Sequence, residues 1–578
     1  MPSNFEISKI LREIGEYLEM QNVPFKPRAY EKAALAVQEL DEETTDLYKE
    51  GGLKALEEIP GVGASIAEKI EELLKTGRLK YYEGLKKKAP VDLSSLTSVE
   101  GLGPKSISRL YQKLGIKNLA DLEKAARAGK IRKLEGFGEK SETKILAGIE
   151  FQKKSGGRFL LGDVLFLGRG IEERLERLPE VEKAMVAGSI RRRKETIGDV
   201  DILVISKKSK KVMDYFKNMT EVAMIIASGE TKSSVKLHSG LNVDLRVVPP
   251  ESYGAALNYF TGSKDHNVAL RKIAIEKKLK LNEYGLFKVG KGGKETMIAG
   301  KTEEEIYRAL GMDYIEPEMR ENTGEINFSL KHKLPKIVGY GDLEGDLQTQ
   351  TEWTDGSDSI EDMAKAGIKA GLKYIAITDH TKRLAMTGGL GEKMVLKQMV
   401  EIDRVNKKLG GKIKILKGTE CDILKDGSMD LPDSILSKLD VVGASVHSLF
   451  NLSEADQTAR IKKAMVNPNV DIIFHPTGRL INRREAYKVD IEEIVKFAKK
   501  TGTVLEANAD TNRLDLKDEY IKKCVEAGVK ISVDSDAHSA GQVGFLELGI
   551  AQARRGWATK HDIINAWPPD KMKSFLKK

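Results

Sequence analysis

The stretch VAGSIRRRKETIGDVDILVI, residues 186–205, decides the fold of the middle of this chain. Asp199 and Asp201 alternate with β-branched residues, which predicts a strand with both carboxylates on one face. A second alternating run, LNVDLRVV at 241–248, carries Asp244. Three carboxylates on neighbouring strands can hold two magnesium ions about 4 Å apart, one activating a hydroxyl and one binding a triphosphate. The alternative is a surface strand with solvated aspartates.

The residues just before the two aspartates suit a triphosphate. Gly188 and Ser189 can form a tight turn whose backbone N–H and hydroxyl hold phosphate oxygens, and the run Arg191, Arg192 and Arg193 supplies positive charge. Together with the aspartates, this pattern favours a nucleotidyl-transfer site over a solvated surface strand.

Upstream, one Gly-x-Gly pattern occurs three times, each time followed by the start of a helix. The copies are EIPGVGASIAEKI (58–70), SVEGLGPKSISRL (98–110) and KLEGFGEKSETKI (133–145), with the glycine pairs Gly61 and Gly63, Gly101 and Gly103, and Gly136 and Gly138. Without a Cβ, the backbone can approach a ligand closely, and the helix N-terminus offers N–H groups to an anion. A helix-hairpin-helix binds a DNA phosphate in this way, so binding is expected to be non-specific and salt-sensitive. A single copy could merely join two helices, but three copies favour DNA binding.

Length, charge and cysteine content limit the classes of protein to which this chain can belong. A chain of 578 residues is too long for one ordinary domain, and 96 Lys and Arg against 87 Asp and Glu give a net charge of +9, which permits an anionic partner. Only Cys421 and Cys524 are present, which excludes a disulfide framework or a cysteine zinc site and fits a reducing compartment. No stretch reaches transmembrane length and the N-terminus is unlike a signal peptide, so we expect a cytoplasmic protein without a membrane partner.

Residues 1 to about 325 resemble a family X DNA polymerase, through the hairpins, GSIRR…GDVD…VDLRVV, and ALNYFTGSKDHNVALR at 256–271. The resemblance implies that Asp199, Asp201 and Asp244 are catalytic residues that bind Mg²⁺ or Mn²⁺. It also implies a set of nucleotide-binding residues, namely Gly188, Ser189, Arg192, Tyr259, Phe260, Gly262 and Asn267.

Within that set, Tyr259 and Phe260 match residues beside the nucleotide sugar, where an aromatic wall crowds a ribose 2′-OH. Asn267 matches a minor-groove contact to the incoming base, and Arg271 matches a contact to the template strand of DNA. Taken alone, the two aromatic residues would suggest core packing, but their register with Asn267 favours the sugar wall.

The first hairpin segment resembles the part of the family's lyase domain whose lysine forms a Schiff base with an abasic sugar. The matching residue is Lys69, which implies AP/dRP lyase activity. An amine reacts only when unprotonated, so a lowered pKa or a proton acceptor such as Glu68 or Tyr30 is required. Lys26 and Tyr30 match the family's DNA-end pocket. The alternative is that Lys69 is a solvated lysine beside an apolar helix stripe.

After a polar linker, strand-like and helix-like runs alternate about seven times, which predicts a parallel sheet or barrel. Polar residues follow the C-terminal ends of the strand-like runs, where a barrel gathers its active site. They are His380, Glu420, His447, His475, Asp536 and His538. So many ligand-type side chains at equivalent ends favour a metal pocket over isolated structural histidines.

Residues 337–575 resemble the polymerase and histidinol phosphatase (PHP) domain at the C-terminus of bacterial and archaeal family X polymerases. The matching motifs are ITDHT, GTECDI, ASVHSLF, FHPTGRL and DSDAHS. That family uses nine metal ligands around three ions, and seven match here, namely Asp355, His380, Glu420, His447, His475, Asp536 and His538.

The stretch GDLQTQTEWTDG, residues 345–356, has Gln348 and Gln350 at the other two ligand positions, which are histidines in the family. The resemblance implies that these positions share one ion with Glu420 and Asp536. Because a neutral amide oxygen binds manganese or zinc far less strongly than imidazole, we expect partial Mn²⁺ or Zn²⁺ occupancy and a weak or absent 3′-5′ exonuclease.

The expected fold is a multidomain α/β chain with helical helix-hairpin-helix N-terminal domains, a nucleotidyltransferase palm with a mixed sheet, and a C-terminal PHP domain that forms a distorted (βα)7-like barrel. The expected domains are a lyase-like helix-hairpin-helix domain (1–88), a second DNA-binding helix-hairpin-helix subdomain (89–155), the palm (156–248), a nucleotide- and template-binding subdomain (249–325), a linker (326–336) and the PHP domain (337–578).

We therefore expect a monomeric DNA-directed DNA polymerase that acts on gapped or nicked DNA with dNTPs, in base excision repair or end joining. One alternative is a PHP-type 3′-5′ exonuclease or phosphoesterase whose polymerase half mainly targets DNA. Another is a non-catalytic DNA-end scaffold. The complete set of three aspartates argues against both.

Overall fold

The computed structural model describes every residue except 1, 3, 39, 41, 100, 155–156, 291–292, 385–386 and 577–578. The chain forms two compact units, one of residues 1–158 with 480–485 and one of residues 159–479 with 486–578. The first unit is called the helical unit below. The finer domain boundaries expected from the sequence stay predictions.

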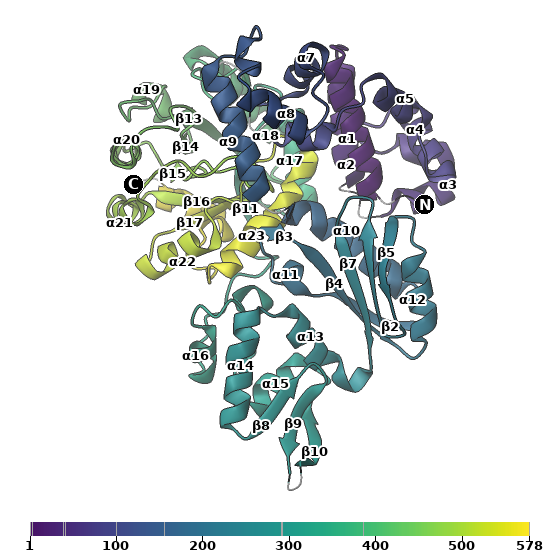
Figure 1. The fold of residues 1–578 in the computed structure, drawn as a ribbon. Helices are drawn as coiled ribbons and strands as arrows, with labels where there is room; N and C mark the ends of the chain where they lie inside the picture. The colour runs from purple at the N-terminus through teal and green to yellow at the C-terminus, as the bar shows by residue number, and fades with distance from the viewer. Residues whose placement is uncertain are drawn as a thin grey trace. The chain divides into compact units, whose positions relative to one another are not determined.

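The helical unit confirms the predicted helical character of the N-terminal part (Figure 1). On its first helix, Ile7, Leu11 and Ile14 recur every three or four residues and are fully buried, as expected for an amphipathic helix. One hydrophobic cluster extends from Ile7 to Ile149, so packing holds helices too short to be stable alone. The helices are α1 (Asn4–Met20), α2 (Lys26–Gln38), α3 (Thr44–Glu57), α4 (Ala64–Thr76), α5 (Lys80–Lys88), α6 (Leu93–Thr97), α7 (Pro104–Leu114), α8 (Leu119–Arg127), the 3₁₀ helix η1 (Ile131–Lys133) and α9 (Glu139–Lys154).

The three Gly-x-Gly segments adopt one shared backbone geometry. The first glycine of each pair has a left-handed φ, +79° at Gly61 and +84° at both Gly101 and Gly136, which only glycine adopts readily. The second glycine is followed at once by helix α4, α7 or α9. Between the glycines, Val62 and Leu102 are buried in the core and Phe137 is partly buried against it, so an apolar side chain anchors each turn.

The second unit begins with the palm, whose central sheet has the strand order β2-β4-β7-β6-β5. β4 and β7 pair in parallel and the other neighbours pair antiparallel, so the predicted mixed sheet is confirmed. The palm elements are β1 (Phe159–Leu160), α10 (Leu161–Glu176), β2 (Val181–Val186), α11 (Gly188–Arg191), β3 (Thr196–Ile197), β4 (Asp199–Ser206), α12 (Ser209–Lys217), β5 (Val222–Ser228), β6 (Lys232–Leu237) and β7 (Asn242–Val248).

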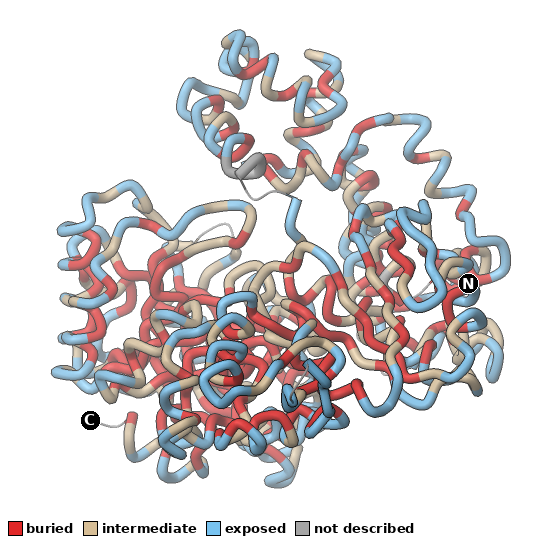
Figure 2. Tube along the Cα trace, turned by 60° about the horizontal axis from the view of Figure 1, so that its bottom comes forward, coloured by how far each residue is buried: buried red, intermediate tan, exposed pale blue. Residues whose placement is uncertain are grey.

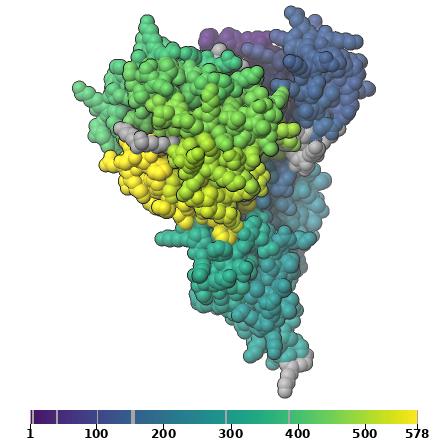
Figure 3. All heavy atoms as spheres, turned by 90° about the vertical axis from the view of Figure 1, so that its left-hand side faces the viewer, coloured from purple at the N-terminus to yellow at the C-terminus, as the bar shows by residue number. Residues whose placement is uncertain are grey.

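A small subdomain follows, residues 249–325, with a three-stranded antiparallel sheet ordered β10-β9-β8. In Figure 3 it extends from the barrel and narrows toward its far end. Its elements are η2 (Pro250–Ser252), α13 (Tyr253–Thr261), α14 (Lys264–Glu276), β8 (Leu279–Asn282), β9 (Gly285–Val289), β10 (Glu295–Ala299), α15 (Glu303–Ala309) and η4 (Pro317–Met319).

The segment predicted as a polar linker is partly folded. Helix α16 (Glu325–Leu330) occupies its beginning, and the Phe328 ring packs edge-on against Trp557 at 5.4 Å between centroids. Glu325 is fully buried, and its Oε1 lies 2.7 Å from Nδ1 of the His266 ring. Phe328 and Glu325 therefore attach this polar segment to its neighbours.

The elements from β11 to α24 form the barrel, with seven parallel strands in sequence order from β11 to β17. This confirms the predicted (βα)7-like architecture (Figure 1). Its elements are β11 (Gly345–Thr349), α17 (Ile360–Lys369), β12 (Tyr374–Ile377), α18 (Glu392–Leu409), β13 (Lys414–Asp422), α19 (Asp433–Leu436), β14 (Val441–Ser445), α20 (Glu454–Val466), β15 (Ile472–Ile473), α21 (Ile491–Thr501), β16 (Val504–Asn508), α22 (Asp518–Ala527), β17 (Ile531–Asp534), η6 (Ala540–Phe545), α23 (Leu546–Arg555), η7 (Ile564–Ala566) and α24 (Pro569–Leu576).

The first and last strands nearly close the barrel. Asp536 N donates to Gln348 O at 3.1 Å and Gln350 N donates to Ala537 O at 2.8 Å, just beyond the ends of β17 and β11. All residues of β11, β12, β14, β16 and β17 are buried, as expected for parallel strands covered on both faces. Figure 2 shows this concentration of buried chain inside the barrel, with exposed surface on its outer helices.

Candidate active sites

The palm brings the three predicted aspartates onto two adjacent strands. Asp199 and Asp201 lie on β4, and Asp201 pairs in register with Asp244 on β7. Val200 and Ile202 point to the opposite face and are fully buried, which fixes the carboxylates on the more open face. Burial raises the pKa of Asp201 to about 6, and the neighbouring carboxylates Asp199 and Asp244 add to the rise. Such mutual repulsion is relieved by divalent cations, so this set of ligands fits Mg²⁺.

The turn before β4 packs directly on this carboxylate cluster. Gly188 has a φ of +65°, and a Cβ there would lie 2.9 Å from Asp201 Oδ2, so the position requires glycine on both counts. Ala187 N donates to Asp201 O at 2.8 Å and ties the turn to the strand. The Gly188 backbone therefore lies beside the carboxylates, and the role of the next residue, Ser189, at a triphosphate stays a prediction.

The arginine run is less available to a triphosphate than the sequence suggested. Arg191 Nη2 pairs with Glu303 Oε2 at 2.6 Å and is mostly buried. Arg193 Nη2 pairs with Glu547 Oε1 at 3.1 Å. Acidic partners distant in sequence therefore pair with both guanidiniums, and the expectation that they supply positive charge to a triphosphate stays a prediction.

Arg192 lies between the palm and the small subdomain. Its Nε pairs with Glu321 Oε1 at 3.1 Å, and its Nη1 donates to the carbonyl of Thr261. A Cβ at Gly262 would come within 3.2 Å of Arg192 Nη1, and the φ of Gly262 is +68°. Glycine at 262 therefore makes room for the guanidinium, which places these two predicted nucleotide-binding residues in one cluster.

The predicted sugar wall lies at the end of α13. The rings of Tyr259 and Phe260 meet edge to face at 5.1 Å between centroids, and Tyr259 is 36% exposed. Asn267 Nδ2 donates to Tyr259 O at 2.7 Å, so these two predicted nucleotide-binding residues lie next to each other. Arg271 is exposed on α14.

Arg246 is a residue that the sequence reasoning missed. It lies two residues after Asp244 on β7, and its guanidinium stacks on the Phe260 ring at 4.4 Å from the centroid. Its Nε is buried without a hydrogen-bond partner. The period of the strand could have revealed it, because residues two apart on a strand lie on one face and Asp244 is two residues before Arg246.

In the helical unit, the predicted lyase lysine is partly buried. Lys69 Nζ donates to Ser65 O at 2.7 Å and Ser65 Oγ at 3.0 Å. Burial lowers the pKa of Lys69; nearby Glu68 opposes the shift and Lys26 adds to it. Burial raises the pKa of Tyr30 to about 12, so this phenol is protonated at neutral pH and is a poor proton acceptor. Of the two proton acceptors considered from the sequence, Glu68 is the better candidate.

In the barrel, three of the predicted histidines lie around the Glu420 carboxylate. Its Oε1 lies 2.8 Å from His475 Nε2 and 3.0 Å from His447 Nε2, and its Oε2 lies 3.3 Å from His380 Nδ1. The histidines follow strand ends as predicted, but Glu420 lies within β13 and not past its end. β13 runs nine residues, longer than its neighbours, so this carboxylate remains part of the strand.

A second group forms around Asp355. Its Oδ2 lies 3.6 Å from His380 Nε2 and 3.7 Å from His538 Nε2. His538 in turn has its Nδ1 4.0 Å from Asp536 Oδ1. Two sets among the described residues have ligand atoms within 4.8 Å of one another, Asp355 with His380 and His538, and His380 with Glu420 and His447. Mixed imidazole and carboxylate ligands of this spacing fit manganese or zinc.

Gln348 and Gln350 both form hydrogen bonds with polar side chains of this pocket. Gln350 Nε2 donates to Glu420 Oε2 at 2.9 Å, and Asn508 Nδ2 donates to Gln348 Oε1 at 3.2 Å and to Asp536 Oδ2 at 3.1 Å. Arg513 Nε lies 3.4 Å from the same Asp536 oxygen. N–H groups and a guanidinium therefore face the two carboxylates on this side of the pocket.

Four segments match known families. Residues 2–79 match the helix-hairpin-helix domain, 93–150 the SAM-like helix-hairpin-helix tandem, 256–321 the DNA polymerase beta thumb and 346–473 the PHP domain. Among the described residues, no helix combines the length and apolar character needed to cross a membrane.

Curated relatives cover either the whole chain or the barrel. The chain is 37% identical over 576 residues to the DNA polymerase/3′-5′ exonuclease PolX of Bacillus subtilis (strain 168), covering 99% of both chains. Its C-terminal part is 33% identical over 233 residues to a probable phosphatase of Thermoanaerobacter sp. (strain X514), covering 38% of this chain and 88% of that one. A probable phosphatase of Caldicellulosiruptor bescii is 31% identical over 198 residues, 33% of this chain and 77% of that one. With its mixed-sheet palm and seven-stranded barrel, the chain belongs to the family X DNA polymerases that carry a C-terminal PHP domain.

Proposed function

We propose that this polymerase fills gaps during DNA repair, in base excision repair or end joining, with Asp199, Asp201 and Asp244 as the catalytic carboxylates. The observation that carries the proposal is the register of Asp201 opposite Asp244, beside the turn at Gly188 and Ser189. Bound Mg²⁺ would supply Lewis acidity for the attacking hydroxyl and the triphosphate. The three carboxylates hold that charge, and Ser189 and Arg192 orient the phosphates.

The substrate is proposed to be gapped or nicked DNA with dNTPs. Three hairpins of equal geometry support binding to several phosphates along the DNA backbone, and Arg271 is assigned to the template strand. Tyr259 and Phe260 are assigned to the sugar and Asn267 to the incoming base. These assignments favour the domain boundaries expected from the sequence, with DNA binding in residues 1–155 and nucleotide addition in 156–325.

Lys69 is proposed as the amine of an AP/dRP lyase. Its lowered pKa supports the role, because more of the side chain is then unprotonated at neutral pH than in a solvated lysine. Lys26 and Tyr30 complete the proposed DNA-end pocket, Tyr30 as a neutral hydroxyl.

The barrel is proposed to retain part of a metal pocket and to be impaired as a 3′-5′ exonuclease. Asp355, His380 and His538 still form one ligand group. Phosphoester hydrolysis on several ions needs them placed together, and the glutamine position offers N–H donors to the carboxylates in place of ligands. The match of the barrel to probable phosphatases favours hydrolysis as the second candidate function.

A primer-extension assay on gapped, nicked and blunt DNA tests the main proposal. Asp201→Asn should reduce nucleotide addition by at least about 10³-fold while DNA binding stays unchanged, because the ions must act together. The matched control is Asp214→Asn, whose side chain is 53% exposed on α12. Near-normal extension by Asp201→Asn would refute the assignment of the site, and equal use of the three DNA substrates would refute gap filling.

A further inference from the structure

Helix α23 of the barrel lies against the turn that carries the proposed triphosphate contacts. Arg555 Nη1 donates to Arg192 O at 2.7 Å, and Gln552 Nε2 donates to Arg193 O at 3.2 Å. Arg193 has a φ of +55°, a left-handed backbone that is unfavourable for an arginine. Such a backbone persists only where its surroundings hold it, and here two barrel side chains bind the carbonyls on either side of it.

The same helix also reaches the side chain of Arg192 through a shared carboxylate. Glu321 Oε1 accepts from Arg192 Nε at 3.1 Å and from Arg555 Nη1 at 3.0 Å. Burial raises the pKa of Glu321, but Arg555 and then Arg192 outweigh it, so the net shift is downward and the carboxylate is charged at neutral pH. With Nε held by Glu321 and Nη1 by the Thr261 carbonyl, the plane of the Arg192 guanidinium is fixed.

Arg555 is itself held firmly by the barrel. It is 6% exposed, and its Nη2 donates to Asp518 on α22 at 2.5 Å. A guanidinium with carboxylates on both sides and a carbonyl in front has little freedom. Arg555 therefore connects barrel helices α22 and α23 to the palm turn at Arg192.

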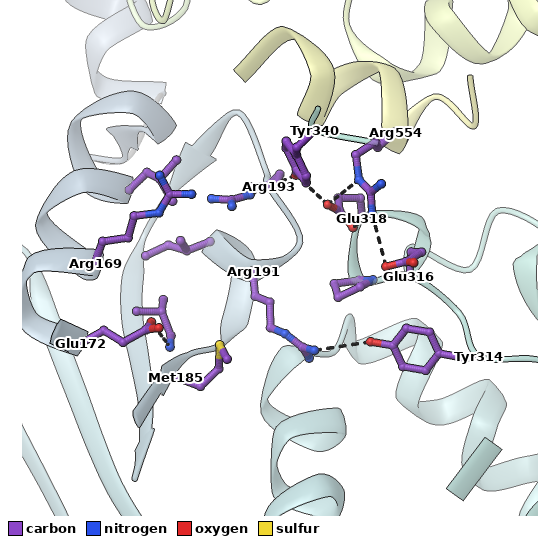
Figure 4. Close-up of a pocket in the computed structure, with 14 residues that line it drawn as sticks. Arg169, Glu172, Met185, Arg191, Arg193, Tyr314, Glu316, Glu318, Tyr340 and Arg554 are labelled. Atoms are coloured by element: carbon purple, nitrogen blue, oxygen red, sulfur yellow. Dashed lines mark hydrogen bonds and ion pairs between the residues drawn. The ribbon is translucent and has the colours of Figure 1, made fainter. Parts of the chain in front are cut away.

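The neighbouring Arg554 shows that this contact is specific. It lies on the same helix and is also buried, but it binds Glu318 Oε1 at 2.8 Å and Glu316 Oε2 at 3.2 Å. Figure 4 shows it at the edge of a cavity of about 400 Å³ between the palm, the small subdomain and the barrel. Arg554 thus fastens the barrel to the same subdomain without touching Arg192, which makes it a matched control.

We propose that Arg555 is a positioning residue for nucleotide addition and that the barrel, through α23, holds the nucleotide-binding turn in its working geometry. The inference rests on the proposed role of Arg192 at the triphosphate. In this role the barrel would support nucleotide addition even without metal ions bound in the barrel pocket.

Steady-state extension of gapped DNA by the full chain tests this directly, with kcat and the KM for dNTP measured separately. Arg555→Ala should raise KM about five- to tenfold, the effect of losing one ordinary hydrogen bond, with kcat within about twofold. Arg554→Ala should leave both constants within about twofold of the unaltered chain. Arg555→Lys, which keeps the charge but not the fork of donors, should give an intermediate KM.

Two further measurements separate positioning from general damage. Thermal unfolding of the variants shows whether Arg555→Ala folds; if it does not, the intermediate KM of Arg555→Lys carries the test. In an Arg192→Ala background, Arg555→Ala should have a smaller effect on KM than alone, because the two residues act through one contact. Unchanged KM in both Arg555 variants, an equal rise in Arg554→Ala, or full additivity with Arg192→Ala would overturn the inference.

The outcome for Arg192→Ala alone distinguishes this inference from the proposed function beneath it. If that variant leaves KM for dNTP unchanged, the triphosphate assignment fails. If it raises KM while the Arg555 variants do not, the assignment stands and the role of the barrel helix fails.

Discussion

The palm and the barrel both gather acidic side chains on parallel strands, but they complete their sites differently. In the palm, three carboxylates lie on two strands, and burial together with their mutual repulsion raises the pKa of Asp201 to about 6. In the barrel, Glu420 and Asp536 already accept hydrogen bonds from Gln350 and Asn508. The palm cluster has a cationic partner, Lys232 Nζ at 2.9 Å from Asp244 Oδ2, whereas amide N–H groups occupy both barrel carboxylates. Carboxylates that repel one another attract ions, and those supplied with N–H donors have less need of them. The difference lies in the neighbouring side chains and not in the strand architecture.

The largest expected effect comes from restoring imidazoles to the barrel. Gln348→His with Gln350→His should raise 3′ to 5′ digestion about 10²- to 10³-fold and add one bound ion per chain, because ligands would replace N–H donors. Digestion of single-stranded DNA with Mn²⁺ and metal analysis of the purified chain measure both. Gln112→His controls for a new exposed imidazole. If neither digestion nor bound metal increases, the glutamines do not account for the difference between the palm site and the barrel site.

A buried ion-pair cluster between the palm and the small subdomain gives the protein a pH-dependent contribution to stability. Burial raises the pKa of Glu303, but Arg320 and Arg191 outweigh it and bring it to about 2 from an ordinary value of 4.5. A depressed pKa means stability that is fully present above pH 4.5 and is lost as the pH falls through about 2, and this shift corresponds to about 3 kcal/mol. Glu303→Gln should therefore be less stable at pH 7, with a gap that closes toward pH 2.

Chemical denaturation of both proteins between pH 7 and pH 2 measures this gap. A constant difference across that range would mean that Glu303 is not held charged by the two arginines. Such a result would also weaken the view that the pair between Arg191 and Glu303 holds the turn to the small subdomain.

Lys69 offers a reactive site that depends on one amine and on no ion. Lys69→Ala should lower the yield of a borohydride-trapped adduct with a 5′ abasic sugar at least about tenfold, while Lys75→Ala on the same helix should keep it. Because burial lowers the pKa of Lys69, trapping should persist to lower pH than for a solvated lysine. An equal yield with Lys69→Ala would move the lyase role to another residue.

The smallest effect is expected at the sugar wall. Tyr259→Ala should narrow the preference for deoxynucleotides over ribonucleotides a few-fold, because the adjacent Phe260 ring remains. Competition between dNTPs and rNTPs in primer extension measures it, with Tyr284→Ala, an exposed tyrosine of the same subdomain, as the control. Equal use of both sugars by the unaltered chain would contradict the steric argument.

The sequence predicts what depends on local period and turn chemistry. Alternation placed Asp199 and Asp201 on one face, and Gly-x-Gly spacing located the three hairpins, because side-chain direction and left-handed turns follow from neighbouring residues. Strand-like runs with polar residues at their ends likewise predicted the barrel and its ligand ring.

Contacts between distant residues were beyond that reasoning. Arg555 and Arg192 are 363 positions apart, and nothing local to either indicates the other. The acidic partners of Arg191 and Arg193, and the N–H donors that Asn508 and Arg513 supply to Asp536, also depend on how elements pack. Periodicity fixes the face of a strand but not which element lies against it.

The most direct test of the contrast between palm and barrel compares both activities in one preparation of the unaltered chain. Extension of a gapped primer with Mg²⁺ and digestion of single-stranded DNA with Mn²⁺ are measured as initial rates per chain. We predict that extension exceeds digestion at least about 100-fold, because only the palm presents a complete ligand set. Manganese-dependent digestion at a rate close to extension, and abolished by His475→Ala, would contradict the account.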